Sequence, residues 1–186
     1  MTHVAPVPSG LAAQVEAATG VRLSDCYQCG KCAAGCPVAG RADLPPSRLL
    51  RLLQLGLPGM DARVLSSEAI WLCLTCETCS SRCPQMVELP RVMDQLRHES
   101  LARGLAHPGA KDILAFHRAL LTSVRRSGRL YEVGLVADYK ARTLHLAKDV
   151  GLAPRLFFKG KLALLPHLIR DRKGLRALFR RAGSRG

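Results

Sequence analysis

Eight cysteines carry the chemistry that this sequence suggests, and they occur in two short runs. Residues 26–37 read CYQCGKCAAGCP, and residues 73–84 read CLTCETCSSRCP. Both runs have the spacing Cys-x2-Cys-x2-Cys-x3-Cys-Pro, and each cysteine of the second run follows its counterpart by 47 residues. Thiols crowded in this way are typical of proteins that bind metals or carry out redox chemistry.

The spacing favours iron–sulfur clusters. Three cysteines at two-residue intervals can wrap a tight loop around one corner of a cubane, but the loop is too short to bring the fourth cysteine back comfortably. In two-cluster ferredoxins a fourth cysteine at this spacing binds the other cluster. We therefore predict two [4Fe–4S] clusters with exchanged fourth ligands. The first set is Cys26, Cys29, Cys32 and Cys83, and the second set is Cys73, Cys76, Cys79 and Cys36.

Other uses of the cysteines fit the pattern less well. Structural zinc sites commonly use two separated Cys-x2-Cys pairs, whereas each run here supplies four cysteines and no histidine at ligand spacing. A thioredoxin-like dithiol requires a single Cys-x2-Cys at a helix start after a strand. Two aromatic residues next to ligand positions, Tyr27 and Trp71, either shield a cluster from water or pack in the core.

The charge is distributed unevenly along the 186 residues. Residues 1–100 hold nine Lys/Arg and nine Asp/Glu, whereas residues 101–186 hold nineteen Lys/Arg and five Asp/Glu, which accounts for the net charge of +14. All eight cysteines lie in the neutral part. We therefore predict a cluster-binding domain at residues 1–105 and a basic helical extension at residues 106–186 that docks on partner proteins.

The hydrophobic pattern predicts helices and no strands. The helical segments are 9–20 (with Ser9 as N-cap), 44–56, a turn near 61–67, 88–104, 108–128 and shorter pieces within 134–151. No segment alternates with period two as a strand would. The predicted fold class is therefore all-α.

The first residues, MTHVAPVPSG, contain neither the basic region nor the apolar region of an export signal. The apolar runs are short and broken by charges or proline, so no transmembrane segment is expected. Disulfides seldom persist in the cytoplasm, so eight cysteines there indicate a metal or redox role. We expect a cytoplasmic protein. No catalytic triad, carboxylate pair or phosphate-binding glycine loop is visible, so the chain is expected to be a non-catalytic electron-transfer subunit.

The two runs and their surroundings resemble a known family. Thirty-six residues with helical character separate Cys36 from Cys73, as in the α-helical ferredoxin fold. Three segments resemble the C subunit of heterodisulfide reductase: CYQCGKCAAGCPVAG, IWLCLTCETCSSRCPQMVELPRVMDQLR and RLFFKGKLALLPHLIRDRKG. The resemblance implies a subunit that relays electrons between a flavin- and cluster-bearing A subunit and a B subunit. In the family, the B subunit holds the disulfide-reducing site on cysteine-rich motifs.

Alternative functions stay open at this point. Iron–sulfur subunits of fumarate reductase or glycolate oxidase type contain a similar cluster domain. They add, however, either a [2Fe–2S] domain, for which the 25 residues before Cys26 leave no room, or a cysteine-rich domain that this sequence lacks. A basic tail is also found in proteins that bind nucleic acid or a membrane surface. We expect no nucleic acid, because leucine, phenylalanine and valine are interleaved with the charges of the tail.

Overall fold

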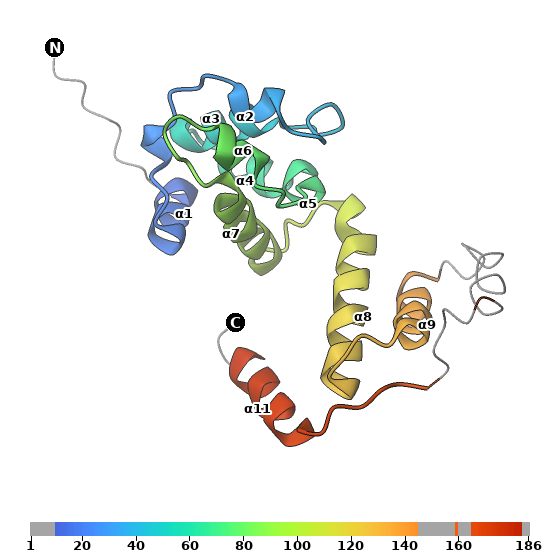
Figure 1. The fold of residues 1–186 in the computed structure, drawn as a ribbon. Helices are drawn as coiled ribbons and strands as arrows, with labels where there is room; N and C mark the ends of the chain where they lie inside the picture. The colour runs from blue at the N-terminus through green and yellow to red at the C-terminus, as the bar shows by residue number, and fades with distance from the viewer. Residues whose placement is uncertain (1–9, 145–158, 160–164, 184–186) are drawn as a thin grey trace, which may run out of the picture. The chain divides into compact units, whose positions relative to one another are not determined.

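The computed structural model describes residues 10–144, 159 and 165–183 of the chain (Figure 1). Every regular element within these residues is a helix and none is a strand, which confirms the all-α fold class. The chain divides into two compact units, Met1–Ala110 and Lys111–Gly186. The separate roles predicted for residues 1–105 and 106–186 stay a prediction.

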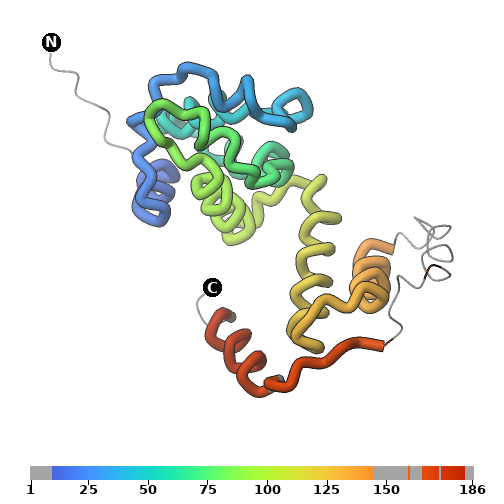
Figure 2. The backbone as a smooth tube through the Cα atoms, viewed as in Figure 1, coloured from blue at the N-terminus to red at the C-terminus, as the bar shows by residue number. Residues whose placement is uncertain are grey.

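The first unit consists of short helices around the two cysteine runs. In chain order they are α1 (Leu11–Thr19), the 3-10 turn η1 (Leu23–Asp25), α2 (Lys31–Ala34), α3 (Pro46–Leu55), α4 (Met60–Leu65), α5 (Ala69–Leu72), α6 (Thr78–Arg82), α7 (Leu89–Ala102) and the 3-10 turn η2 (Pro108–Ala110). We refer to residues 26–36 as the first cysteine loop and to residues 73–83 as the second. Figure 2 shows the two loops next to each other at one end of the unit, where α2 contacts α6.

The long helices of this unit begin and end where their residue types dictate. Pro46 occupies the first turn of α3, where its missing N–H is not needed. The helix ends at Gly56, which adopts the left-handed conformation and donates its N–H to the carbonyl of Leu52. Gly20 ends α1 in the same way, with φ of 72°. The predicted starts and stops of these helices are therefore confirmed within one or two residues.

One hydrophobic core lies between α1, α3, α4 and α7. The helices bury faces with helical spacing, as the sequence pattern predicts. The side chains that are almost fully buried are Leu11, Val15, Leu49, Leu53, Val64, Leu65, Val92 and Leu96. This core fixes the positions of α3 and α7, and these two helices carry the residues that contact the cysteine loops.

Asp43 connects the end of the first cysteine region to the start of α5. Its Oδ1 accepts hydrogen bonds from the Ser67 hydroxyl at 2.7 Å, the Ala69 N–H at 2.9 Å and the Leu44 N–H at 3.0 Å. Partial burial alone would raise the pKa of Asp43, but these hydrogen bonds together lower it below its usual value. The carboxylate therefore holds α5, the helix that leads directly into Cys73.

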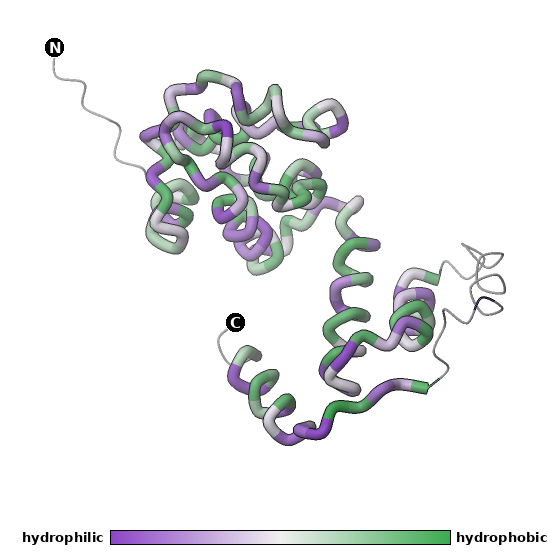
Figure 3. Tube along the Cα trace, viewed as in Figure 1, coloured by the Kyte–Doolittle hydropathy of each residue, from purple (hydrophilic) through white to green (hydrophobic). Residues whose placement is uncertain are grey.

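The second unit contains α8 (Lys111–Ser127), α9 (Glu132–Thr143) and α11 (Arg172–Gly183). Helix α8 packs against α9, where Phe116 and Tyr139 meet edge to face, and it also contacts α11. The Ile169 N–H donates to the Ser127 carbonyl and so fixes the segment before α11. Figure 3 shows hydrophilic residues interleaved with hydrophobic ones along α8 and α11.

Some predictions fall on residues that the structure does not describe. Ser9, the predicted N-cap, lies outside the described residues, as does most of the segment 155–164 of the family resemblance. The last part of the helical piece predicted within 134–151 also lies outside them. In the described part of the chain, no helix has the length and apolar character needed to span a membrane.

We expect the Asp43→Ala variant to lower the stability of the protein by about 1–3 kcal/mol, because three donors, one of them in the buried Ser67, lose their shared acceptor. The measurement is the urea midpoint under anaerobic conditions, followed by circular dichroism. The matched control is Glu88→Ala, which removes an exposed ion pair with Arg91 worth less than about 1 kcal/mol. Equal losses of stability in the two variants would show that the hydrogen bonds of Asp43 contribute no more than an exposed ion pair.

Candidate iron–sulfur centre

The two cysteine loops repeat each other in backbone conformation as well as in sequence spacing. Gln28 and its counterpart Thr75 have φ of 63° and 52°, and Gly30 and its counterpart Glu77 have φ of 77° and 60°. Left-handed residues of this kind are uncommon outside glycine, and successive N–H groups around them form concave anion-binding turns. The repeat of 47 residues therefore preserves a loop shape that suits an anionic cluster.

Each loop continues into a short helix that contains its third cysteine. Cys32 lies in α2 and Cys79 lies in α6, and the two helices contact each other. The fourth cysteines, Cys36 and Cys83, follow the ends of these helices. Contact between α2 and α6 brings the fourth cysteine of each run toward the other run.

The eight thiols line two adjoining cavities, which share Cys79 and Leu89. One cavity is lined by Cys26, Cys29, Cys32 and Cys83, to which Cys79 is added, and by Ser47, Leu50, Val87 and Leu89. The other is lined by Cys36, Cys73, Cys76 and Cys79, together with Val38, Leu44, Pro90 and Met93. Apart from Cys79 in the first cavity, each set thus consists of three cysteines of one run and the fourth cysteine of the other. The sequence predicts the same two sets of four as ligands, and their binding of iron stays a prediction.

Within the described residues, no three His, Cys, Asp or Glu side chains converge closely enough to hold one metal ion. The thiols instead stand around the walls of two mainly apolar cavities. Four thiolates that each bind a different iron of a cubane require this wider arrangement.

The thiols differ in their surroundings. Burial raises the pKa of the Cys79 thiol to about 11 and also raises the pKa of Cys32, its counterpart in the first loop. The hydrogen bond with the Thr78 hydroxyl is the main cause of a lowered pKa at the exposed Cys76. Thiols must lose their protons to bind iron, so metal binding at the half-buried Cys32 and Cys79 is coupled to proton release.

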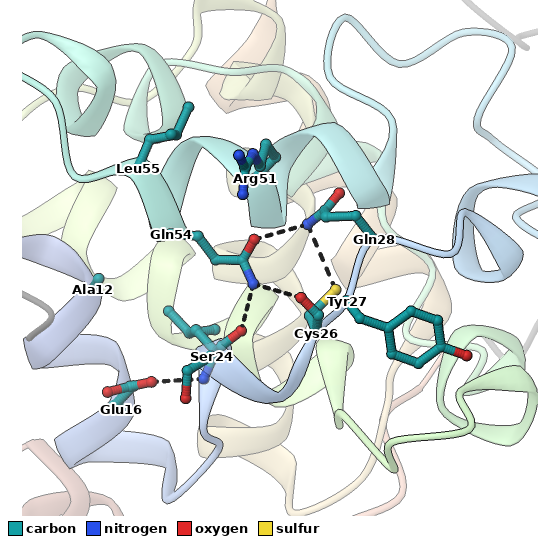
Figure 4. Close-up of a pocket in the computed structure, with 10 residues that line it drawn as sticks. Ala12, Glu16, Ser24, Cys26, Tyr27, Gln28, Arg51, Gln54 and Leu55 are labelled. Atoms are coloured by element: carbon teal, nitrogen blue, oxygen red, sulfur yellow. Dashed lines mark hydrogen bonds between the residues drawn. The ribbon is translucent and has the colours of Figure 1, made fainter. Parts of the chain in front are cut away.

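A helix side chain holds the start of each cysteine loop. Gln54 of α3 donates from Nε2 to the carbonyls of Leu23, at 2.8 Å, and Cys26, at 2.7 Å. Its Oε1 accepts from Gln28, whose Nε2 also lies 3.5 Å from the Cys26 sulfur (Figure 4). At the second loop, Arg97 of α7 donates to the carbonyls of Ile70 and Cys73.

The two aromatic residues next to cluster ligands have different roles. Trp71 is only 6% exposed and does not line either cysteine cavity, so it packs in the core. Tyr27 is 58% exposed and lines an open groove beside Cys26, together with Glu16, Arg51 and Gln54 (Figure 4). Trp71 therefore shields neither cavity, whereas the Tyr27 hydroxyl lies near the first cysteine set, where desolvation and the nearby Cys29 thiol raise the pKa of Tyr27.

Comparisons with known proteins agree with this geometry. Residues 22–87 match the family described as a 4Fe-4S dicluster domain. The chain is 33% identical over 137 residues to the C subunit of the ferredoxin:CoB-CoM heterodisulfide reductase of Methanosarcina mazei, and the match covers 74% of each chain. It is 32% identical over 139 residues to the C subunit of the H(2):CoB-CoM heterodisulfide,ferredoxin reductase of Methanothermobacter thermautotrophicus, and this match covers 75% of the chain and 66% of the relative.

The chain belongs to the family of heterodisulfide reductase C subunits. The resemblance stated from the sequence is therefore confirmed. A further member, the C 2 iron-sulfur subunit of the CoB–CoM heterodisulfide reductase of Methanocaldococcus jannaschii, is 38% identical over 102 residues, or 53% of each chain. The match to these relatives thus extends over between about half and three quarters of their length.

Because the chain belongs to the C-subunit family and contains the dicluster domain, its cofactors are two [4Fe–4S] clusters. The residues present fit this pair of groups, because each of the two cavities contains a set of four cysteines and each loop has left-handed turns. When bound, the clusters accept and release single electrons. The protein supplies thiolates, an apolar enclosure and hydrogen-bond donors to the sulfurs, such as the Val87 N–H at 3.3 Å from Cys83.

Sequence reasoning did not predict Gln54, Arg97 or Asp43. Gln54 has a faint signal, because it lies on the same face of α3 as Ser47 and Leu50, which line the first cavity. Arg97 has none, since an arginine on an amphipathic helix usually faces water. Asp43 lies in a loop, and two of its three partners, Ser67 and Ala69, follow more than twenty residues later.

We expect Gly30→Ala to destabilise the first cysteine loop by about 1–2 kcal/mol, because φ of 77° places a Cβ in the left-handed region although nothing crowds it. Gly40→Ala is the matched control, since a Cβ there also meets open space but φ is ordinary. The measurement is iron retained after anaerobic dialysis, together with the urea midpoint. Identical behaviour of the two variants would contradict the conformational requirement.

Proposed function

We propose that this chain is an electron relay within a heterodisulfide reductase-like complex. Cys26, Cys29, Cys32 and Cys83 hold one [4Fe–4S] cluster, and Cys73, Cys76, Cys79 and Cys36 hold the other. The observation that carries the ligand assignment is that the fourth cysteine of each run lines the cavity of the other run, with Cys79 as the one thiol that lines both cavities. Ligands exchanged in this way hold the two clusters close together, as single-electron transfer between them requires.

The proposed partners are a cysteine-rich catalytic subunit and a flavin- and iron–sulfur-bearing subunit. A relay must meet a donor and an acceptor at different places. Each cysteine loop presents one apolar residue directly after its first cysteine: Tyr27, 58% exposed, and its counterpart Leu74, 65% exposed. Exposed aromatic and apolar side chains of this kind are favoured at protein interfaces. The two loops thus offer one contact surface for each cluster. A cytoplasmic location belongs to the same proposal.

The second unit supplies a surface of another character. A groove between α8 and α11 is lined by Thr122 and by the basic residues Arg125, Arg126, Lys173, Arg176 and Arg180. Among the described residues none of these five cations forms an ion pair, and no acidic side chain lines the groove. We propose that this basic groove binds an acidic segment of a partner subunit, because the exposed Leu121, next to the lining residue Thr122, favours protein over nucleic acid.

The ligand assignment predicts which variants share a defect. The chain reconstituted under anaerobic conditions should hold about eight irons and eight sulfides. Cys36→Ala should alter the same paramagnetic resonance signal as Cys73→Ala, and Cys29→Ala should alter the other signal, because Cys36 lies in the cavity of the second run.

Two kinds of result would contradict these predictions. About four irons per chain, or stoichiometric zinc in the native protein, would exclude a two-cluster relay. If Cys36→Ala and Cys29→Ala alter the same signal, each run holds its own cluster and the exchange of ligands is wrong.

We expect charge reversal in the basic groove to weaken assembly with the two partner subunits at least about tenfold. The variant combines Arg125→Glu, Arg176→Glu and Arg180→Glu. The control combines Lys111→Glu, Arg118→Glu and Arg129→Glu, which removes the same charge from the same unit outside the groove. Co-purification with both named partners is measured at several salt concentrations.

The control separates a site from a general attraction. Equal losses in the two triple variants would show that only the net charge matters. If the groove variant assembles normally but loses affinity for duplex DNA, the groove serves nucleic acid and the protein-docking proposal is wrong.

A further inference from the structure

The same two backbone carbonyls are held at the start of each cysteine loop. Gln54 binds the carbonyls of Leu23 and Cys26, and Arg97 binds those of Ile70 and Cys73. Ile70 follows Leu23 by 47 residues, as Cys73 follows Cys26, so the bound atoms are equivalent in the repeat. In both loops the first cysteine and the residue three positions before it are fixed by one side chain.

The two side chains that do this are not themselves part of the repeat. Gln54 belongs to α3 and Arg97 to α7, and they are 43 rather than 47 residues apart. Unrelated helices thus deliver a long donor side chain to the same pair of carbonyls. Because the supports differ in origin while their targets agree, we treat Gln54 and Arg97 as equivalent positioning residues for the first cysteine of each loop.

The positioning residues differ in charge. The guanidinium of Arg97 is permanently cationic, and its side chain is 21% exposed. The side chain of its ion-pair partner Asp94 is 61% exposed. Because water screens this carboxylate, Asp94 offsets the positive charge of Arg97 only in part. Gln54 is neutral, but it orients Gln28 so that Nε2 lies 3.5 Å from the sulfur of Cys26.

Both arrangements are expected to raise the reduction potential of a bound cluster, although by different means. Reduction makes a cluster more negative, so a nearby cation or an N–H donor to a ligand sulfur stabilises the reduced form and raises the potential. Hydrogen bonds and charges just outside the ligands are the usual means by which proteins tune such centres.

We propose that Gln54 and Arg97 set the reduction potentials of the two clusters independently. Gln54 acts on the cluster at Cys26 through the Gln28 hydrogen bond, and Arg97 acts on the cluster at Cys73 through its charge. The inference rests on the proposed ligand sets. It adds that the repeated loops hold clusters whose potentials are controlled by residues outside the repeat.

The test is a redox titration of the full chain followed by paramagnetic resonance. Arg97→Gln keeps a donor but removes the charge, and it should shift one of the two midpoints to lower potential. Arg97→Lys keeps the charge with fewer donors, and its midpoints should stay near those of the wild type. Gln54→Met should lower the other midpoint, and Gln28→Met should reproduce that shift.

The control is Arg63→Gln, which removes a charge from the exposed surface of α4 in the same unit and should move neither midpoint. The proposal is overturned if Arg97→Gln and Gln54→Met shift the same midpoint, or if neither variant shifts any. If Arg97→Gln does not retain iron, the test is made with Arg97→Lys, which keeps the positive charge. A lowered midpoint potential in Arg97→Lys would then contradict the proposal that Arg97 acts through its charge. The iron content and the number of midpoints test the relay itself, so failure of that proposal is distinguishable from failure of this one.

Discussion

A tight cysteine loop can surround only one side of a cubane, and this limit governs the organisation of the first unit. With our proposed ligand sets, each cluster needs a thiolate from the other loop, so neither site is complete until both loops meet. The contact between α2 and α6 satisfies this requirement, because each fourth cysteine follows one of these helices. Cluster binding and folding of the unit are therefore expected to be coupled.

The loops depend on the core for their position. Leu49 and Leu53 bury one face of α3, which turns Ser47, Leu50 and Gln54 toward the first loop. In α7, Val92 and Leu96 are buried while the next residue, Arg97, reaches the carbonyls before the second loop. Asp43 adds a third link, from the end of the first cysteine region to α5. Packing of apolar faces thus fixes polar side chains that in turn fix the thiols.

Local signals allowed most of the fold and the thiols of the site to be predicted. The signals for helices are local: a proline where a helix starts, a glycine where it ends and periodic leucines between them. The cysteine spacing is likewise a property of about a dozen neighbouring residues. Gln54 and Arg97 could not be predicted, because their partners are backbone carbonyls more than twenty residues away, and a carbonyl has no residue type. The left-handed Glu77 escaped notice because glycine usually marks that conformation. The basic groove requires α8 and α11, which are distant in sequence, to come together.

The separation of charge along the chain gives single residues of the first unit more influence. Residues 1–100 contain equal numbers of basic and acidic residues, and the whole surplus of positive charge lies after them. A cluster in that part of the chain is not surrounded by a general positive field of its own domain. One partly buried guanidinium at the start of a ligand loop then matters, since exposed charges farther than about 10 Å away are largely screened by salt. The repeated cysteine loop gives two similar sites, and unlike supports from α3 and α7 give the chain a means to make them different.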